Sequence, residues 1–129
     1  MRQCIQSADA PPAVGPYSQA IAAGPFVFCS GQIPLKPDGN SWGDADVATQ
    51  TRQVLTNLGA VLNAAGLSLS DVVKTTVFLT NLQDFAAMNE VYASFFSEPF
   101  PARSTIQVSA LPRGAQVEIE AVAFQSQKP

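Results

Sequence analysis

Two runs of apolar residues at helical spacing constrain the fold of this chain most. The first run comprises Val47, Val54, Leu55, Leu58, Leu62 and Ala65, and the second comprises Leu82, Phe85, Met88, Tyr92, Phe95 and Phe96. Such spacing predicts helices with one apolar face each. Asp46 can cap the first helix and Gly66 can end it, while the second must stop before Pro99. We therefore expect two amphipathic helices whose apolar residues lie mostly in the hydrophobic core.

Alternating segments rich in β-branched residues surround the two helices. They comprise residues 18–22, 26–33, 72–80, 103–109 and 116–124, which predicts a sheet. Two helices can cover only one of its faces. We expect Val73, Val77 and Leu79 to face the helices, and Val72 and Phe78 to lie on the uncovered face. Because large apolar side chains need a cover and no second domain is expected, a symmetric homo-oligomer is the simplest prediction.

Length and composition narrow the class of protein. A chain of 129 residues suits one domain, residues 1–129, and a net charge of −3 offers no basic surface to a nucleic acid. No apolar run approaches the ~18 residues of a membrane helix, and no signal peptide is visible. We expect a cytoplasmic protein without nucleic-acid or membrane partners, in which Cys4 and Cys29 are reduced structural thiols.

The chain has no histidine, which removes the commonest general base and the commonest zinc ligand. Any chemistry would have to use carboxylates, Arg, Tyr, hydroxyls, backbone groups and water. We expect neither a metal nor a cofactor.

Arg103 stands out because it follows Pro101 and begins an alternating run. Pro101 restricts the backbone, so the guanidinium would be held in place, and its planar fork of donors matches a carboxylate. Pro and Gly within residues 111–115 predict that the last two strands pair as an antiparallel hairpin. In that register the face turned toward the oligomer carries Arg103, Thr105, Gln107, Glu118 and Glu120.

The same register sets Arg103 roughly 13 Å from Glu118, at ~3.4 Å per residue. One small ligand could not contact both side chains within one chain, so a site that uses both would lie where two subunits meet. Other interpretations stay open from the residues alone. Arg103 could pair with an acid across a subunit contact, and Glu118 and Glu120 could form a solvated strand face.

Seven motifs together carry a resemblance to a known family. They are GPYSQA (15–20), SGQIP (30–34), DVVKTTVFL (71–79), DFAAMNEVYASFF (84–96), FPARS (100–104), ALP (110–112) and VEIEAVAF (117–124). With them the sequence resembles the RidA family, also called the YjgF family, of imine deaminases. The resemblance implies an α+β fold of the chorismate-mutase type, with a mixed six-stranded sheet and two helices on one face. It also implies a homotrimer with ligand clefts between neighbouring chains.

The resemblance also implies roles for particular residues. Arg103 would clamp a substrate carboxylate, and Glu118 would orient or deprotonate a water molecule. The cleft would be lined by Tyr17, Ser30, Gly31, Phe85 and Asn89. Thr105 stands where many relatives have cysteine, so a role of its backbone carbonyl survives and a role of a thiol does not. Without the resemblance, Tyr17 could be a packed aromatic, Gly31 a β-bulge and Asn89 a helix-surface amide.

The implied reaction is the hydrolysis of 2-imino acids, such as 2-iminobutanoate and 2-iminopropanoate, to 2-oxo acids and ammonia. Burial would raise the pKa of Glu118 and a nearby guanidinium would lower it, and the residues alone leave the direction open. One alternative is a non-catalytic trimer that binds small carboxylates at the same cleft. Another is an RNA-cleaving translation inhibitor, which the missing histidine and the acidic balance disfavour.

Overall fold

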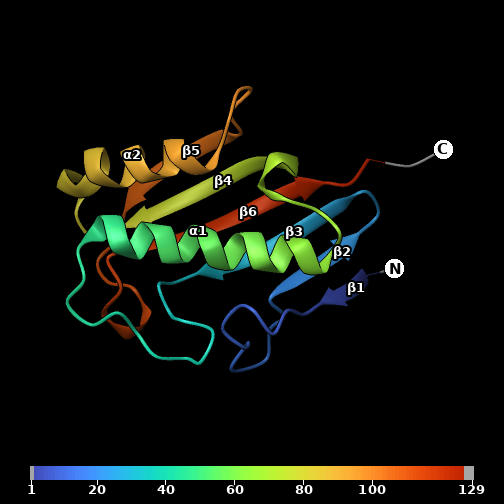
Figure 1. Ribbon diagram of the computed structural model, residues 1–129, viewed down its shortest axis with the longest axis horizontal. Coiled ribbons are helices and arrows are strands. Elements are labelled where there is room, and N and C mark those ends of the chain that lie inside the picture. Colours follow the sequence, from blue (N-terminus) through green and yellow to red (C-terminus); the bar gives the residue numbers. More distant parts are fainter. Residues whose placement is uncertain (1, 127–129) are drawn as a thin grey trace.

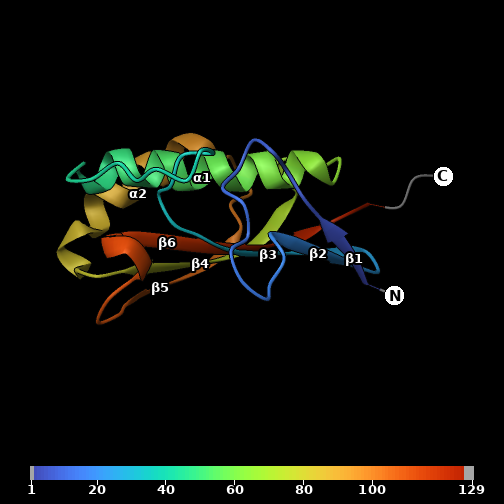
Figure 2. The same ribbon diagram turned by 90° about the horizontal axis from the view of Figure 1, so that it is seen from below.

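The computed structural model describes residues 2–126. Its elements are β1 (Arg2–Ile5), β2 (Ala20–Ala23), β3 (Phe26–Gln32), α1 (Val47–Ala64), β4 (Val72–Leu79), α2 (Phe85–Phe95), β5 (Ala102–Gln107) and β6 (Val117–Phe124). One sheet has the strand order β1-β2-β3-β6-β4-β5, and both helices lie on the same side of it (Figures 1 and 2). The β4–β5 pair is parallel and the other pairs are antiparallel. The expected α+β class with a mixed six-stranded sheet is confirmed.

Helix α1 begins and ends at the residues that the sequence indicates. The Asp46 carboxylate accepts a hydrogen bond of 2.9 Å from the Thr49 backbone N–H, and this bond lowers the pKa of Asp46. Gly66 has a φ of 77°, which glycine adopts without strain, just after the last turn. The apolar face packs on the sheet, and Val54, Leu55, Leu58, Val61 and Leu62 are fully buried.

Helix α2 buries only part of its expected stripe. Met88, Tyr92 and Phe96 lie in the core, whereas Leu82 and Phe85 are 46% and 39% exposed. The chain forms a 3-10 turn over Leu82–Asp84 and enters α2 only at Phe85, so the helical spacing does not extend back to Leu82. The beginning of the stripe is therefore at the surface, and the prediction was wrong there.

The predicted hairpin between the last two strands is also wrong. Strand β5 pairs in parallel with β4, and β6 lies on the other side of β4, between β4 and β3. Pro112 opens a 3-10 turn over Pro112–Gly114, and Arg113 has a φ of 60°. This turn belongs to a longer connection that passes the end of β4, so the Pro and Gly do not join paired neighbours.

Strand β4 contains an irregularity that reverses one assignment. Its register against β6 shifts between Val72 and Lys74, so alternation breaks there. Val72 is 6% exposed and belongs to the core, while Val73 is 44% exposed. Val77 and Leu79 face the helices as expected, and Phe78 lies on the opposite face between them.

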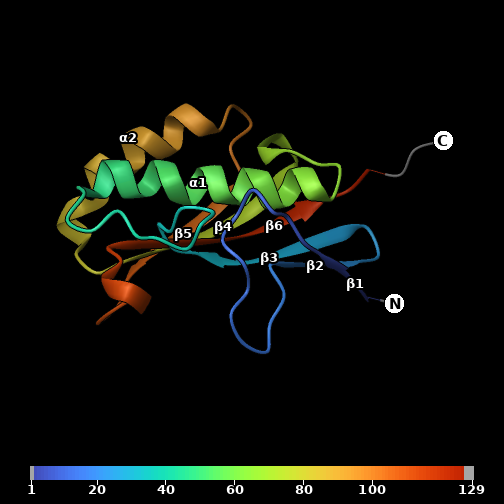
Figure 3. The ribbon, with the colours of Figure 1, turned by 60° about the horizontal axis from the view of Figure 1, so that its bottom comes forward.

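The face of the sheet away from the helices is apolar at several positions. Figure 2 shows this side without a helix. Phe28 is 48% exposed, and its ring neighbour Phe26 also contacts Phe124, with ring centroids 5.6 Å apart. Ile106 on β5 is 45% exposed. We call this surface the open face. The loop between β1 and β2, drawn in blue, projects past it (Figures 2 and 3).

Two further observations concern the cysteines and membranes. Cys29 is buried in the core, where burial raises the pKa of its thiol to about 12, and Cys4 is exposed. A thiol with so high a pKa is a packing group, since the thiolate is the reactive form. No helix among the described residues has the length and apolar character needed to cross a membrane.

Candidate functional site

The guanidinium of Arg103 is held by side chains of α2. Arg103 lies on the edge strand β5, in register with Thr75 of β4. Its Nη1 donates a hydrogen bond of 2.7 Å to the Oδ1 of Asn89. Its Cζ lies 4.8 Å from the ring centroid of Tyr92 and 5.3 Å from that of Phe85. One amide and two aromatic rings therefore fix the position of the cation.

Arg103 and Glu118 lie on opposite faces of the sheet. Thr75, the neighbour of Arg103, is fully buried and bonds to Tyr92 of α2, so Arg103 is on the helix side. Glu118 lies between the fully buried Val117 and Ile119, and its side chain is therefore on the open face. The prediction that both side chains face the oligomer is wrong for Arg103. The error follows from the hairpin register, since β4 separates the two strands.

Glu118 lies against the backbone of β3 at Gly31. A Cβ built on Gly31 would come within 2.9 Å of the Cδ of Glu118, closer than side chains tolerate. The register of β3 against β6 shifts between Cys29 and Gln32, so Gly31 is also part of a β-bulge. The register shift supports the β-bulge interpretation of Gly31, and its place in a ligand cleft stays a prediction. Only glycine lets the carboxylate occupy this place.

Ser30 fixes the loop that carries Tyr17. The Ser30 hydroxyl donates a hydrogen bond of 2.6 Å to the Ser18 carbonyl, and its backbone N–H donates to the Gln19 carbonyl at 2.9 Å. Tyr17 itself is 54% exposed, so it is not a packed core aromatic. Ser30 and Gly31 of β3, Glu118 of β6 and this loop form one group of residues, which we call the Glu118 group.

The pKa of Glu118 is raised above its ordinary value. The main cause is burial of the carboxylate, and the charge of Glu120 adds to it. Within one chain Arg103 lies on the other face of the sheet and is not among the causes of this shift. Within one chain burial therefore sets the direction, and a raised pKa favours proton exchange by this carboxylate.

Thr105 is two residues beyond Arg103 on the same face of β5, in register with Val77. Its Oγ1 is buried and has no hydrogen-bond partner within residues 2–126. Buried hydroxyls are nearly always paired, so this one is an exception among the described residues. We call Arg103, Asn89, Phe85 and Thr105 the Arg103 group.

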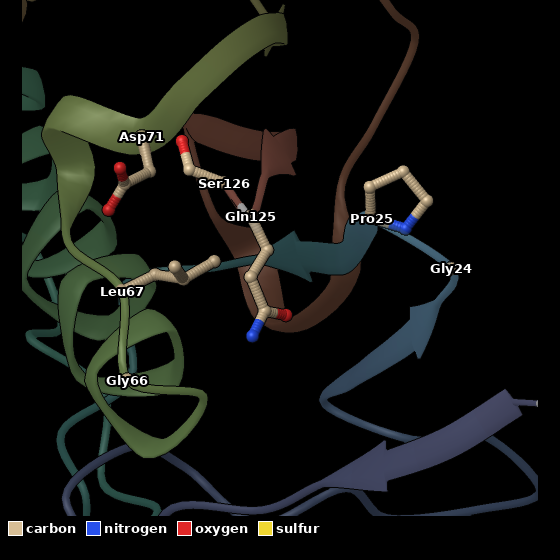
Figure 4. A pocket seen from close by; sticks show the side chains of 7 residues that line it. All are labelled: Gly24, Pro25, Gly66, Leu67, Asp71, Gln125 and Ser126. Carbon is tan, nitrogen blue, oxygen red and sulfur yellow. The ribbon is translucent and has the colours of Figure 1, made fainter. Parts of the chain in front are cut away.

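A hollow of about 480 Å³ lies beside the guanidinium. Its lining residues are Asn89, Tyr92, Ala93, Phe100, Pro101 and Arg103. A larger hollow of about 870 Å³ is lined by Gly24, Pro25, Gly66, Leu67, Asp71, Gln125 and Ser126 (Figure 4). The larger one has no basic side chain in its lining, and an acid ligand therefore fits the hollow at Arg103 better. Among the described residues, no cluster of His, Cys, Asp or Glu is placed to hold a metal ion.

The predicted residues thus fall into two groups that one chain does not join. Arg103, Asn89 and Phe85 are in contact, and Gly31 adjoins Glu118, but the sheet lies between the two groups. Tyr92 was expected only as a core residue, yet it contacts the guanidinium. The spacing of Phe85, Asn89 and Tyr92, four and three residues apart on one helix, is the signal that could have identified it.

Three comparisons place the chain among known proteins. A sequence profile of the family described as endoribonuclease L-PSP matches residues 7–125. The human 2-iminobutanoate/2-iminopropanoate deaminase is 46% identical over 125 residues, which cover 97% of this chain and 91% of that protein. A crystal structure of a Thermotoga maritima protein has a TM-score of 0.94 at 44% identity and covers 98% of this chain and 100% of its own.

A structure with a bound amino acid is also similar. The crystal structure of E. coli TdcF with bound serine has a TM-score of 0.89 at 45% identity, over 96% of this chain and 99% of that one. Profile, sequence and fold agree over nearly the whole length. The chain therefore belongs to the endoribonuclease L-PSP family, which is the RidA (YjgF) family that its motifs indicate.

Proposed function

We propose that the protein hydrolyses 2-imino acids, such as 2-iminobutanoate and 2-iminopropanoate, to 2-oxo acids and ammonia. The observation that carries the proposal is the guanidinium of Arg103, held by Asn89 and two aromatic rings beside a hollow of about 480 Å³. The human relative named for this reaction, at 46% identity, supports the substrate class.

Arg103 acts as the clamp for the substrate carboxylate. A guanidinium has five N–H donors, and the hydrogen bond to Asn89 uses only one of them. The remaining donors can form a bidentate, charge-assisted pair with the carboxylate. Because the cation is already fixed, little conformational freedom is lost when the substrate binds.

The working site is shared between two chains of a homotrimer. The Arg103 group lies under α2 at the edge strand β5, and the Glu118 group lies on the open face, so one chain cannot present both to one small molecule. A neighbouring copy whose open face meets the β5 edge would bring its Glu118 to this chain's Arg103. The exposed rings of Phe26, Phe28 and Phe124 give that contact an apolar area to bury.

The reaction needs only positioning and proton transfer. Arg103 fixes the imine carbon near a water molecule, and the protonated imine is already electrophilic. Glu118 takes a proton from the water molecule as the water oxygen adds to the imine carbon. Glu118 then returns the proton to the nitrogen of the tetrahedral intermediate. The C–N bond breaks as the C=O bond forms, and the released ammonia takes up the proton of the hydroxyl group as ammonium. The raised pKa of Glu118 suits both proton transfers.

The test couples the protein to an amino-acid dehydratase that generates the imine in solution. We expect 2-oxobutanoate and ammonia to appear faster with the protein than without it. Arg103→Ala should abolish the acceleration while the oligomer persists. Arg103→Lys, which keeps the charge but loses the fork, should restore only a small part. Near-normal turnover by Arg103→Ala would contradict the clamp.

Two alternative functions also have support, and experiments on the same purified protein and variants can distinguish them. The serine bound to E. coli TdcF favours a carboxylate-binding role, which predicts saturable binding of 2-oxobutanoate without any acceleration. The description of the family as endoribonuclease favours RNA cleavage. That activity would be intrinsic only if it disappears in a variant of this chain, and cleavage that survives both Arg103→Ala and Glu118→Gln would indicate a contaminant.

A further inference from the structure

We infer that Tyr92, tethered by Thr75, is a positioning residue that sets the orientation of the Arg103 guanidinium toward the substrate carboxylate. The inference rests on the proposed role of Arg103 and adds to it a side chain that does not itself need to touch the substrate.

The ring of Tyr92 is fixed at its hydroxyl and at its side. The hydroxyl shares a hydrogen bond of 2.7 Å with the Oγ1 of Thr75, and Tyr92 and Thr75 are 4% and 0% exposed. The ring packs against Phe96 with centroids 4.5 Å apart. A ring held at both places has one orientation, and Arg103 lies 4.8 Å from its centroid.

The tether joins the two elements that define the clamp. Thr75 is the residue of β4 in register with Arg103, and Tyr92 lies one helical turn beyond Asn89 on α2. The Thr75–Tyr92 hydrogen bond therefore fixes α2 next to the position on the sheet from which the Arg103 side chain extends. It sets the distance at which Asn89 accepts from Nη1 and at which the ring meets the guanidinium.

The electrostatics of Tyr92 agree with this geometry. Burial raises the pKa of Tyr92, while the hydrogen bond with Thr75 and the positive charge of Arg103 lower it. The charge of Arg103 is thus felt at the phenol. A cation held against an aromatic face in a partly desolvated place is attracted more strongly than one in water.

The experiment compares Tyr92→Phe, Tyr92→Leu, Thr75→Val and the double variant Tyr92→Phe/Thr75→Val. In each we measure kcat and KM in the coupled assay, the Kd for 2-oxobutanoate, the ¹⁵Nε–Hε NMR signal of Arg103 and thermal unfolding. Met88→Leu, a volume-conserving change in the buried face of α2, is the control. Tyr92→Phe keeps the ring, so it should fold even if Tyr92→Leu does not.

For Tyr92→Phe we expect KM and Kd to rise about threefold, with kcat changed less, because the cation is misplaced. For Tyr92→Leu, where the ring is lost, we expect a rise of about tenfold or more. The double variant is decisive. It leaves no unpaired hydroxyl, so its stability should recover relative to Thr75→Val, while KM stays raised and the Arg103 signal stays shifted or broadened.

If Tyr92→Phe and the double variant both keep the wild-type KM, Kd and Arg103 NMR signal, the inference is wrong. Tyr92 is then a packing residue. This outcome is distinct from a failure of the proposed function. If the wild-type protein binds 2-oxobutanoate but accelerates no deamination, the deaminase proposal fails, while Kd and the NMR signal still test the role of Tyr92. If 2-oxobutanoate does not bind to the wild-type protein or perturb the Arg103 signal, the inference fails with the clamp.

Discussion

At the residue scale, the contact between Gly31 and Glu118 makes a sharp prediction. A methyl group on Gly31 would come within 2.9 Å of the Glu118 Cδ, so Gly31→Ala should displace the carboxylate from its place on the open face. We expect kcat to fall about tenfold or more, as for a misplaced general base, with the fold retained. Steady-state kinetics and circular dichroism check it.

Gly59→Ala is the matched control for this change. A Cβ on Gly59 would lie 3.9 Å from Leu69, an ordinary contact, and Gly59 is in the middle of α1. Alanine there should stabilise the helix by about 0.5–1 kcal/mol and leave kcat unchanged. Equal activity of the two variants would show that the position of Glu118 is not critical.

The pKa of Glu118 leads to a second prediction at this scale. Because burial raises the pKa of Glu118, ionisation of this side chain destabilises the folded state. The stabilisation is fully present below the ordinary pKa of 4.5 and is lost as the pH rises through the raised pKa. Glu118→Gln removes that penalty. We expect the variant to be at least as stable as the wild type at pH 7, with this advantage disappearing below the ordinary pKa.

The same variant should lose most of its activity. We expect kcat to fall by about 10²–10⁴ because glutamine cannot accept a proton. The wild-type rate should decline as pH falls through the raised pKa, since the protonated carboxyl is no base. Thermal melts and pH–rate profiles check both halves. A variant that is less stable at pH 7 and fully active would assign Glu118 to structure alone.

Single residues also mark the limit of what the sequence could predict. The motifs identified Arg103 and Glu118 as site residues, and their roles stay predictions. Their faces were not predictable, because a face depends on which strand pairs with which. Arg103 was assigned to the open side by counting from a turn, and its true neighbour, Thr75, is 28 positions away in the sequence.

At the element scale, local sequence signals predicted the two helices but gave the wrong pairing for the last two strands. Asp46 and Gly66 bound α1 because capping chemistry acts within one helical turn. The parallel β4–β5 pair has no such local signal, since a parallel connection depends on how α2 packs back on the sheet. The short edge strand β1 was missed because Arg2–Ile5 buries only Ile5 and shows no alternation of apolar residues.

Helix α1 supplies the third prediction, because its apolar face is the centre of the core. Leu58 is fully buried, and Leu58→Ala should lower the free energy of unfolding by about 2–5 kcal/mol through the cavity it leaves. Thr56→Ala, on the exposed side of the same helix, should change it by less than about 0.5 kcal/mol. Urea unfolding at a fixed protein concentration measures both changes. Equal unfolding midpoints for the two variants would show that the apolar face of α1 is not part of the core.

At the scale of the whole molecule, the open face is the feature that an isolated chain leaves unexplained. Phe28 is 48% exposed there, close to Phe26. A glutamate at position 28 would place a charge in the proposed subunit contact, where burial without a partner is costly. We expect Phe28→Glu to be a folded monomer with little deaminase activity, measured by light scattering and the coupled assay.

Trp42→Glu is the control for that surface change. Trp42 is 41% exposed on the loop between β3 and α1, where its indole donates to Gln53 of α1, on the helix side. We expect this variant to keep both assembly and activity. If Phe28→Glu remains a trimer, or if its monomer is fully active, the open face is not the subunit contact that completes the site.

The separation of Arg103 from Glu118 by the sheet allows a test that no single variant provides. Arg103→Ala and Glu118→Gln each destroy one half of every site and should be inactive alone. When the two are unfolded together and refolded as mixed trimers, some interfaces join an intact Arg103 from one chain to an intact Glu118 from its neighbour. Random assembly of equal amounts restores about a quarter of the sites. A site contained within one chain would restore none, so the recovered rate, compared with each variant refolded alone, decides whether catalysis belongs to the chain or to the assembly.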